Sequence, residues 1–240
     1  KEQIQTQLSK KEYTHLINLA AYTKVDLAET ESTLAYSINA DAVKNLADFA
    51  KDNNIIFVHL STDYVFDGEQ EKPYLETHTP KPINVYGSSK LAGESYIQEH
   101  LEKYYIIRSS WLYSNYGHNF YKSISRAILD NKTLNITTEQ IGTPTLVDDL
   151  VDVLFKIIAS KKQAYGLYHF ANEGQATWYD FALAIEKKSL GSPKELIQPI
   201  SVYPAAARRP KFSVLDINKI KQTFGIEIRT WQAALKELRK

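Results

Sequence analysis

The sequence predicts an α/β fold, with a doubly wound parallel sheet and a smaller C-terminal lobe. Three observations predict it. Short apolar runs bounded by turn residues alternate with segments whose apolar residues recur at helical spacing. The runs are almost continuously apolar, which is typical of parallel strands buried on both faces. Their order, strand then helix then strand, joins them into a parallel sheet through right-handed crossovers.

The first 110 or so residues contain the series that builds this sheet. We expect strands over residues 16–21, 55–60 and 105–108, where apolar residues run together. Between them, residues 32–51 and 85–101 are predicted as helices, and the first of these has a clear apolar stripe along one side. Together the five segments form a βαβαβ series.

The rest of the chain has less regular spacing, and helix-end signals guide its assignment. Thr177 is predicted as an N-cap, with Asp180 three residues on, for a helix through Lys187. Asp216 is predicted to open a further helix that Gly225 ends. The other expected elements are helices over residues 120–129 and 147–159 and strands over residues 134–136 and 166–170.

The composition excludes several classes of function. The 29 Lys and Arg residues balance 28 Asp and Glu residues, so we expect no nucleic-acid partner and no polybasic contact with a membrane. No apolar run approaches the roughly 20 residues of a membrane span, and a cytoplasmic location is the default expectation. The chain has no cysteine, hence no disulfide, thiolate nucleophile or Cys-ligated zinc. Its 6 histidines show no metal-ligand spacing, so no metal site is predicted from the residues.

Polar side chains that could carry chemistry gather after the second predicted strand. Ligands of open parallel sheets bind at the carboxyl ends of the strands. There the sequence has Ser-Thr-Asp-Tyr at residues 61–64, and the next helix begins with Tyr86 and Lys90, four residues apart and therefore on one helix face. With 16 tyrosines in the chain this pair alone carries little weight, and its place beside the hydroxyl-rich strand end is what makes it notable.

A tyrosine beside a lysine can act as a general acid on a carbonyl group. A free phenol has a pKa of about 10, and a nearby ammonium lowers that pKa. Tyr86 could then give a proton to an alkoxide as hydride reaches the carbonyl carbon, while the Thr62 hydroxyl polarises the carbonyl. No side chain carries hydride, so this chemistry needs a nicotinamide cofactor.

These residues resemble a known superfamily. Thr62, Tyr86 and Lys90 match the catalytic triad of the extended short-chain dehydrogenase/reductases, which implies a Rossmann-like sheet. Longer strings are similar to the dTDP-4-dehydrorhamnose reductase family within it. In chain order these strings lie at residues 18–26, 61–68, 84–94, 108–113, 119–120, 140–145 and 207–210.

The resemblance implies an enzyme that reduces the 4-keto group of dTDP-4-dehydro-L-rhamnose to dTDP-L-rhamnose with NADPH or NADH. It makes Tyr86 the general acid, gives Lys90 the roles of lowering the pKa of Tyr86 and holding the nicotinamide ribose, and lets Thr62 orient the ketone. The residues implied to line the dinucleotide, besides Tyr86 and Lys90, are Ala20, Ala21, Tyr22 and Thr23, and those implied to bind the substrate are Asp63, Tyr64, Trp111, Asn119, Phe120, Arg208 and Arg209.

The resemblance also implies a division of the chain. Residues 1–112 with about 137–171 would form a dinucleotide-binding domain, and about 113–136 with 172–240 a substrate-binding lobe. The expected partner is a dTDP-linked 4-keto sugar. The resemblance further allows a homodimer and a Mg²⁺ ion that bridges its contact.

One part of the family pattern is missing from the chain. The family opens with a strand and a Gly-x-x-Gly-x-x-Gly loop that binds the cofactor pyrophosphate, whereas the first glycine here is Gly68. The chain begins with Lys1 and contains no methionine. We therefore expect it to be N-terminally incomplete. The first βαβ unit would be missing, and with it the segment that determines whether NADH or NADPH is preferred.

Other interpretations stay open on the sequence alone. One is a regulatory subunit that binds a dinucleotide, like the beta subunit of methionine adenosyltransferase, and another is a nucleotide-sugar epimerase or dehydratase. A dehydratase would place an acidic pair after Thr62, where this chain has Asp63 and Tyr64. Without the family, Trp111 fits a core as well as a site, and residues 208–209 fit a solvated surface.

Overall fold

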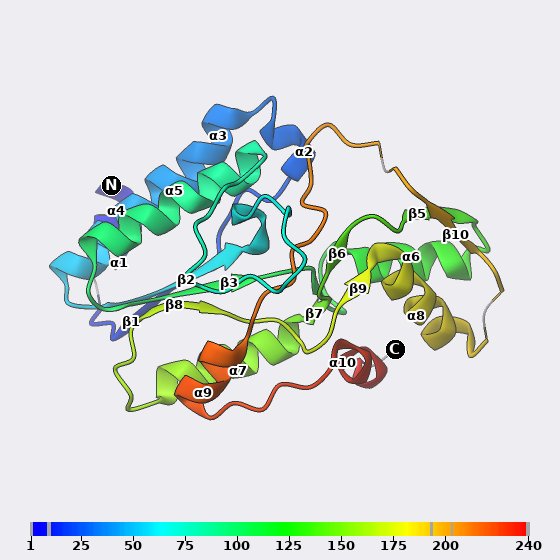
Figure 1. The fold of residues 1–240 in the computed structure, drawn as a ribbon. Helices are drawn as coiled ribbons and strands as arrows, with labels where there is room; N and C mark the ends of the chain where they lie inside the picture. The colour runs from blue at the N-terminus through cyan, green and yellow to red at the C-terminus, as the bar shows by residue number, and fades with distance from the viewer. Residues whose placement is uncertain (1, 9–10, 193, 203, 239–240) are drawn as a thin grey trace.

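The computed structural model describes residues 2–8, 11–192, 194–202 and 204–238. At its centre lies a sheet of four parallel strands in the order β1, β2, β3, β8. The strands are β1 (His15–Asn18), β2 (Ile56–Thr62), β3 (Tyr104–Ser109) and β8 (Gly166–His169). This confirms the predicted α/β fold with its parallel sheet (Figure 1).

Helices cover both faces of this sheet. On one face lie α3 (Ser32–Tyr36), α4 (Ala42–Asp52) and α5 (Val85–His100), and on the other lie α7 (Val147–Ala159) and α9 (Asn218–Phe224) (Figure 1). Successive side chains of each strand therefore enter different cores, because they point to opposite faces of the sheet.

This alternation determines which side chains of the sheet meet α5. Phe57 packs in the core beneath α4 and α5, whereas Val58 packs in the core on the side of α7 and α9. His59 and Ser61 follow on the same side as Phe57, and Arg108 of β3 reaches that side as well. Toward the carboxyl ends of β2 and β3, the face beneath α5 is thus polar and buried.

The helix predicted over residues 32–51 is broken in the middle. Ser37–Asp41 form one π-helical turn, and the Asn39 side chain within it is fully buried. Its oxygen accepts the Tyr22 N–H at 2.8 Å, and its nitrogen donates to the Ser89 hydroxyl at 3.0 Å. These contacts join segments far apart in the chain, which is why local periodicity did not predict the break.

The first strand is shorter and less buried than the sequence predicted. β1 ends at Asn18, before the expected end at residue 21, and Ile17 is 41% exposed. β1 is one of the two edge strands of the described sheet. Its apolar side chains are therefore covered less completely than those of β2 and β3.

The lobe packs helices against a small parallel ribbon. Its helices are α6 (Phe120–Leu129), α8 (Trp178–Leu190) and α10 (Trp231–Glu237), and the ribbon pairs β5 (Leu134–Thr137) with β10 (Ile197–Ile200). Their apolar faces share one core. No helix in the described part of the chain is long and apolar enough to span a membrane.

Helix ends in the second half follow the predicted signals closely. α6 and α7 begin and end at the predicted residues. Thr177 and Asp180 form the capping box of α8, which runs on past its expected end. α9 begins at Asn218 rather than Asp216, whose carboxylate accepts the Asn218 N–H at 2.9 Å, and it ends before Gly225 as predicted.

Several short elements were not predicted from the sequence. Two short ribbons lie where the chain passes between sheet and lobe. In one, residues 112–113 pair with residues 145–146 in parallel, and in the other, residues 141–142 pair with residues 176–177 antiparallel. The unpredicted elements are α1 (Glu2–Leu8), α2 (Val25–Ala28), β4 (Leu112–Tyr113), β6 (Ile141–Gly142), β7 (Thr145–Leu146), β9 (Ala176–Thr177), a 3-10 turn (Asp63–Val65) and, in the lobe, β10 and α10.

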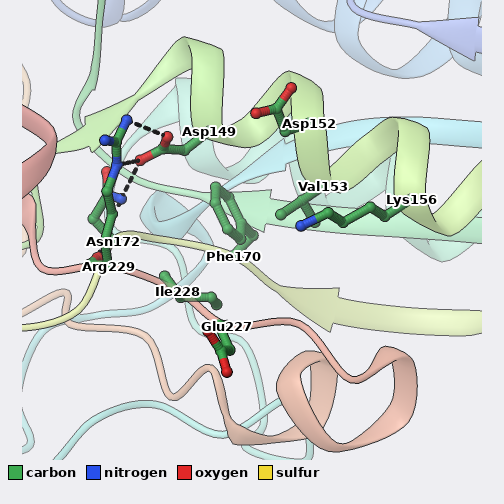
Figure 2. Close-up of a pocket in the computed structure, with 9 residues that line it drawn as sticks. All are labelled: Asp149, Asp152, Val153, Lys156, Phe170, Asn172, Glu227, Ile228 and Arg229. Carbon is green, nitrogen blue, oxygen red and sulfur yellow. Dashed lines mark hydrogen bonds and ion pairs between the residues drawn. The ribbon is translucent and has the colours of Figure 1, made fainter. Parts of the chain in front are cut away.

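An ion pair and a hydrogen bond connect the segment before α10 to α7. Arg229 binds the Asp149 carboxylate through Nε at 3.0 Å and a terminal nitrogen at 2.7 Å, and the Asn172 amide donates to the same carboxylate at 2.6 Å. These groups line a cavity of 340 Å³, with Asp152 and Lys156 farther along α7 (Figure 2). These contacts hold the C-terminal helix of the lobe against the sheet domain.

Replacing Gly93 with alanine tests how closely α5 packs. A Cβ atom at this position would overlap the Asn39 carbonyl oxygen. We expect Gly93→Ala to lower the free energy of unfolding by about 1–3 kcal/mol, although alanine is the better helix former by about 1 kcal/mol. Urea unfolding measures the change, with Gln98→Ala on the exposed side of the same helix as control. A Gly93→Ala protein as stable as the wild type would contradict the packing argument.

Candidate active site

The N-terminal end of α5 lies tightly against the end of β2. Asn84 caps the helix, because its side-chain oxygen accepts the Gly87 N–H at 2.7 Å. A Cβ atom on Gly87 would overlap the Tyr64 carbonyl oxygen, so glycine permits this close approach of helix and strand end. The approach brings Tyr86 to the carboxyl end of β2.

A buried ion pair holds the same helix two turns further on. Arg108 of β3 binds the Glu94 carboxylate through Nε at 3.0 Å and a terminal nitrogen at 2.6 Å, and the Ser61 hydroxyl also donates to it. Glu94 is 0% exposed and Arg108 1%. The two-pronged geometry and the third donor satisfy a carboxylate that has lost its water.

Thr62, the last residue of β2, and Asp63, which follows it, lie in a dry environment. The Thr62 hydroxyl donates to the Asp63 carboxylate at 3.1 Å and accepts the Tyr64 N–H at 3.2 Å. Asp63 is 2% exposed, and burial raises the pKa of its carboxyl to about 6. This carboxyl therefore changes its charge just below neutral pH.

Tyr86 stands beside these groups, and Lys90 lies one turn further along the same face of α5. The Tyr86 ring packs edge to face on Tyr64, with ring centroids 5.7 Å apart, and its hydroxyl is hydrogen-bonded to Thr62. Lys90 is 2% exposed, and its ammonium donates to the Leu60 carbonyl at 2.7 Å. The structure thus gathers the three side chains of the predicted triad at one strand end.

Burial shifts both members of the tyrosine–lysine pair. It raises the pKa of Tyr86 to about 12, against a smaller lowering by the hydrogen bond with Thr62. It lowers the pKa of Lys90 to about 8. The net direction for Tyr86 is opposite to the expectation from the sequence, because burial disfavours the charged phenolate and the Asp63 carboxylate adds to this effect.

The segment after β1 lies at the same edge of the sheet as the end of β2. Ala20 and Thr23 are exposed there, and Ala21 is half-buried. Tyr22 is buried, with its hydroxyl donating to the Glu31 carboxylate at 2.5 Å. Backbone and small side chains, rather than the Tyr22 ring, are therefore accessible at this edge.

A cavity of 370 Å³ lies between the strand end and the lobe. Trp178 forms an aromatic wall, since it packs against Phe120 at 4.5 Å and stacks on Trp111 at 3.6 Å between ring centroids. Arg209 reaches the cavity while it donates to Asp26 at 2.8 Å. Aromatic walls edged by amides and hydroxyls suit a planar heterocycle. The other lining side chains are Tyr64, Ile124, Asn135, Ile136, Thr137 and Gln140.

The remaining predicted substrate residues surround this cavity with different local roles. Asn119 caps α6, its oxygen accepting a backbone N–H of the first turn at 3.2 Å. Trp111 has a left-handed backbone, with φ 45°, and its indole leaves no room for a Cβ on Gly142. Arg208 is exposed and lines a neighbouring cavity of 230 Å³ together with Arg209.

Trp178 is the cavity residue that the sequence did not single out. It follows the Thr177 helix cap and belongs to no recognised string, so only the packing of α8 against α6 reveals it. Within the described ranges, no group of three or more His, Asp or Glu side chains is placed to hold a metal ion.

The fold and this site define a class of protein. A parallel α/β sheet with a Tyr-x-x-x-Lys helix beside a threonine at a strand end is the arrangement of the extended short-chain dehydrogenase/reductases. Within that class, the model of the RmlD substrate binding domain family matches residues 1–240, and the chain belongs to this family.

Individual relatives agree with this placement. The chain is 42% identical over 234 residues to the dTDP-4-dehydrorhamnose reductase of Aggregatibacter actinomycetemcomitans, covering 93% of this chain and 80% of the relative. It is 38% identical over 232 residues to the Escherichia coli K12 protein of the same name, covering 93% and 78%. The crystal structure of dTDP-4-dehydrorhamnose reductase from Bacillus anthracis in complex with NADP aligns with a TM-score of 0.93 and 38% identity over 99% of this chain and 84% of that one. The predicted family is confirmed.

Glu94→Gln tests the buried ion pair. It leaves the Arg108 charge buried without its carboxylate, so we expect the free energy of unfolding to fall by about 3–5 kcal/mol. Replacing both partners, as in Glu94→Gln with Arg108→Met, removes the unpaired charge and should recover much of this loss. Equal stability of the single and double variants in urea unfolding would show that the pair does not carry the proposed electrostatic role.

Asp63 predicts a pH dependence of stability. Its folded-state pKa of about 6 lies above the unfolded value, so the folded protein binds this proton more tightly. The free energy of unfolding should therefore fall as the pH rises from about 4 to about 6, by about 2–3 kcal/mol from this group.

Asp63→Asn cannot ionise and should flatten that part of the stability curve. Urea unfolding of both proteins at a series of pH values measures the difference. Parallel curves for the two proteins between pH 4 and pH 7 would exclude the shifted carboxyl as the cause.

Proposed function

We propose that this protein reduces the 4-keto group of dTDP-4-dehydro-L-rhamnose to dTDP-L-rhamnose with NADPH, a step of nucleotide-sugar and cell-surface polysaccharide biosynthesis. One observation carries the proposal: Tyr86, Lys90 and Thr62 meet at a strand end, between the open segment after β1 and the aromatic cavity of the lobe. The relatives named dTDP-4-dehydrorhamnose reductase support the reaction, and the NADP complex of the Bacillus anthracis protein supports NADPH over NADH.

The residues present fit a nicotinamide cofactor at the edge formed by β1 and β2. Ala20 and Thr23 are exposed there, Ala21 is half-buried, and the Tyr22 backbone is held in place by Asn39. We assign Ala20, Ala21, Tyr22 and Thr23 to the dinucleotide, and Lys90 to its ribose. When bound, the reduced nicotinamide supplies the hydride.

The chain's own residues supply the proton. As hydride adds to the carbonyl carbon, the C=O bond opens to an alkoxide, and the Tyr86 hydroxyl gives its proton to that oxygen. Tyr86 is left as a phenolate and regains its proton from solvent. Its pKa of about 12 keeps it protonated at neutral pH, and it is still a stronger acid than the alcohol that forms. Lys90 stabilises the phenolate, and the Thr62 hydroxyl, released from Asp63, can donate to the ketone oxygen.

The lobe cavity and its surroundings account for the rest of the substrate. Phe120 and Asn119 are assigned to the nucleotide part, Asp63, Tyr64 and Trp111 to the sugar, and Arg208 and Arg209 to the diphosphate, because guanidinium groups bind phosphate oxygens in pairs. Residues 1–112 with about 137–171 would then serve the dinucleotide, and the two lobe segments the substrate. A homodimer remains part of the proposal for the assembled enzyme.

Tyr86→Phe tests the assigned acid. Removing the hydroxyl should reduce the rate of NADPH oxidation by dTDP-4-dehydrorhamnose by about 10²–10⁴-fold, with a small effect on KM, since the proton is needed only in the transition state. The decrease in absorbance of the reduced nicotinamide measures the rate in the full-length protein. Tyr116→Phe, at an 80% exposed tyrosine, is the matched control and should keep full activity.

Two results would decide against the assignment. Full activity of Tyr86→Phe would exclude Tyr86 as the acid, whatever the substrate. A wild-type protein that binds NADPH but never oxidises it with this sugar would favour the regulatory-subunit interpretation instead.

A further inference from the structure

We infer that His59 is a positioning residue for Lys90, which it holds through the imidazole Nε2 while Asn18 fixes the opposite side of the ring. The three side chains come from β1, β2 and α5 and form one buried line. His59 is 0% exposed, Lys90 2% and Asn18 6%. The Lys90 ammonium lies 3.3 Å from Nε2, and the Asn18 amide nitrogen lies 3.1 Å from Nδ1. The inference rests on the proposed function, because it gives His59 a part in the Tyr86–Lys90 acid pair.

Lys90 needs this contact because it is a buried cation whose nearby carboxylate is engaged. Glu94 lies one turn away on α5 and is bound by Arg108. The ammonium has three N–H donors, and the Leu60 carbonyl accepts one of them at 2.7 Å. His59 supplies a second acceptor. Neutral acceptors lower the cost of keeping a charge out of water, so they determine whether Lys90 stays charged.

His59 can accept from an ammonium only as a neutral ring with its hydrogen on Nδ1. Burial and the charge of Lys90 both lower its pKa well below the usual value, which keeps the ring neutral. A neutral imidazole has one N–H and one lone pair. When the Asn18 amide turns its oxygen toward Nδ1, that nitrogen donates to Asn18, and Nε2 keeps its lone pair for Lys90.

The structure places the Asn18 amide in the opposite orientation, with its nitrogen toward His59 Nδ1, and this is the competing arrangement. A half-turn of the amide exchanges its oxygen and nitrogen. The competing arrangement lets the amide oxygen accept the Ala20 N–H at 3.2 Å and puts the ring hydrogen on Nε2. That hydrogen would then face the Lys90 ammonium, donor against donor, inside a dry site. Ala20 is exposed, so water can satisfy its N–H instead. The first orientation therefore removes the donor-against-donor contact at Lys90, the charged member of the line.

Other charged and titratable groups also face the pair from the surrounding elements. Glu94 acts on Lys90 from α5 and is itself bound by Arg108 of β3. Tyr86 lies one turn before Lys90 on α5, and Asp63, next to the end of β2, acts on Tyr86. Glu94 raises the pKa of Lys90 from a fixed position in its ion pair. Because none of these groups is altered when His59 is replaced, a change in Lys90 reports on His59.

Nitrogen NMR of the full-length protein tests the inference without substrate. We expect His59 to be neutral with its hydrogen on Nδ1. In His59→Leu the Lys90 ammonium, identified by its loss in Lys90→Met, should titrate about one pH unit lower, the effect of losing one hydrogen bond to a charged group. His59→Gln offers an oxygen near the Nε2 position and should restore the titration. A hydrogen found on Nε2, or an unchanged Lys90 titration in His59→Leu, would overturn the inference.

The pH profile of kcat is the functional readout. In His59→Leu the alkaline limb of the kcat profile should shift to lower pH by about one unit. KM for the sugar should stay unchanged, and His59→Gln should restore the wild-type profile. His169→Leu removes another fully buried histidine, from β8 and outside this line, and should keep the wild-type profile. A uniform loss of kcat without a shift would mean that His59 is merely structural. Absence of activity in the wild type would instead reject the proposed function, while the NMR titration still decides the role of His59.

Discussion

The Glu94–Arg108 ion pair is the interaction on which the geometry of the site depends. It is buried, it joins α5 to β3 through two guanidinium nitrogens, and Ser61 of β2 donates to the same carboxylate. A buried pair tolerates little change in geometry, because either charge left unpaired is costly. The helix therefore cannot slide along the sheet. Tyr86 and Lys90 are carried on this helix, so their distances to the end of β2 follow from the same contact.

Burial of the site sets its electrostatics as well as its geometry. It raises the pKa of Tyr86 to about 12 and of Asp63 to about 6, and it lowers the pKa of Lys90 to about 8. A reductase needs its acid protonated, and the shift of Tyr86 ensures this at neutral pH. The shift of Lys90 works in the opposite sense, since it brings the cation close to losing its charge. The neutral acceptors around the ammonium, Leu60 and His59, are the groups that counter this loss.

Elements specified by local signals were predictable from the sequence, and those specified by distant contacts were not. α6 and α7 match their predicted ranges because each has a complete amphipathic pattern. The π turn at Ser37–Asp41 was missed because its cause is the contact of Asn39 with residues on other segments. The Thr62, Tyr86 and Lys90 cluster was predictable because the fold brings strand ends together. The pKa direction of Tyr86 and the place of Trp178 were not, since both depend on packing.

In the proposed reaction, hydride passes from the nicotinamide to C4 of the sugar while the protein's own residues supply the proton. The most direct measurement uses NADPH with deuterium at both C4 positions of the nicotinamide, dTDP-4-dehydrorhamnose and the full-length protein in ordinary water, with mass spectrometry and proton NMR of the sugar product. We expect dTDP-L-rhamnose with one deuterium, bound to C4. A product without deuterium at C4, or deuterium at another carbon, would contradict the proposed reaction.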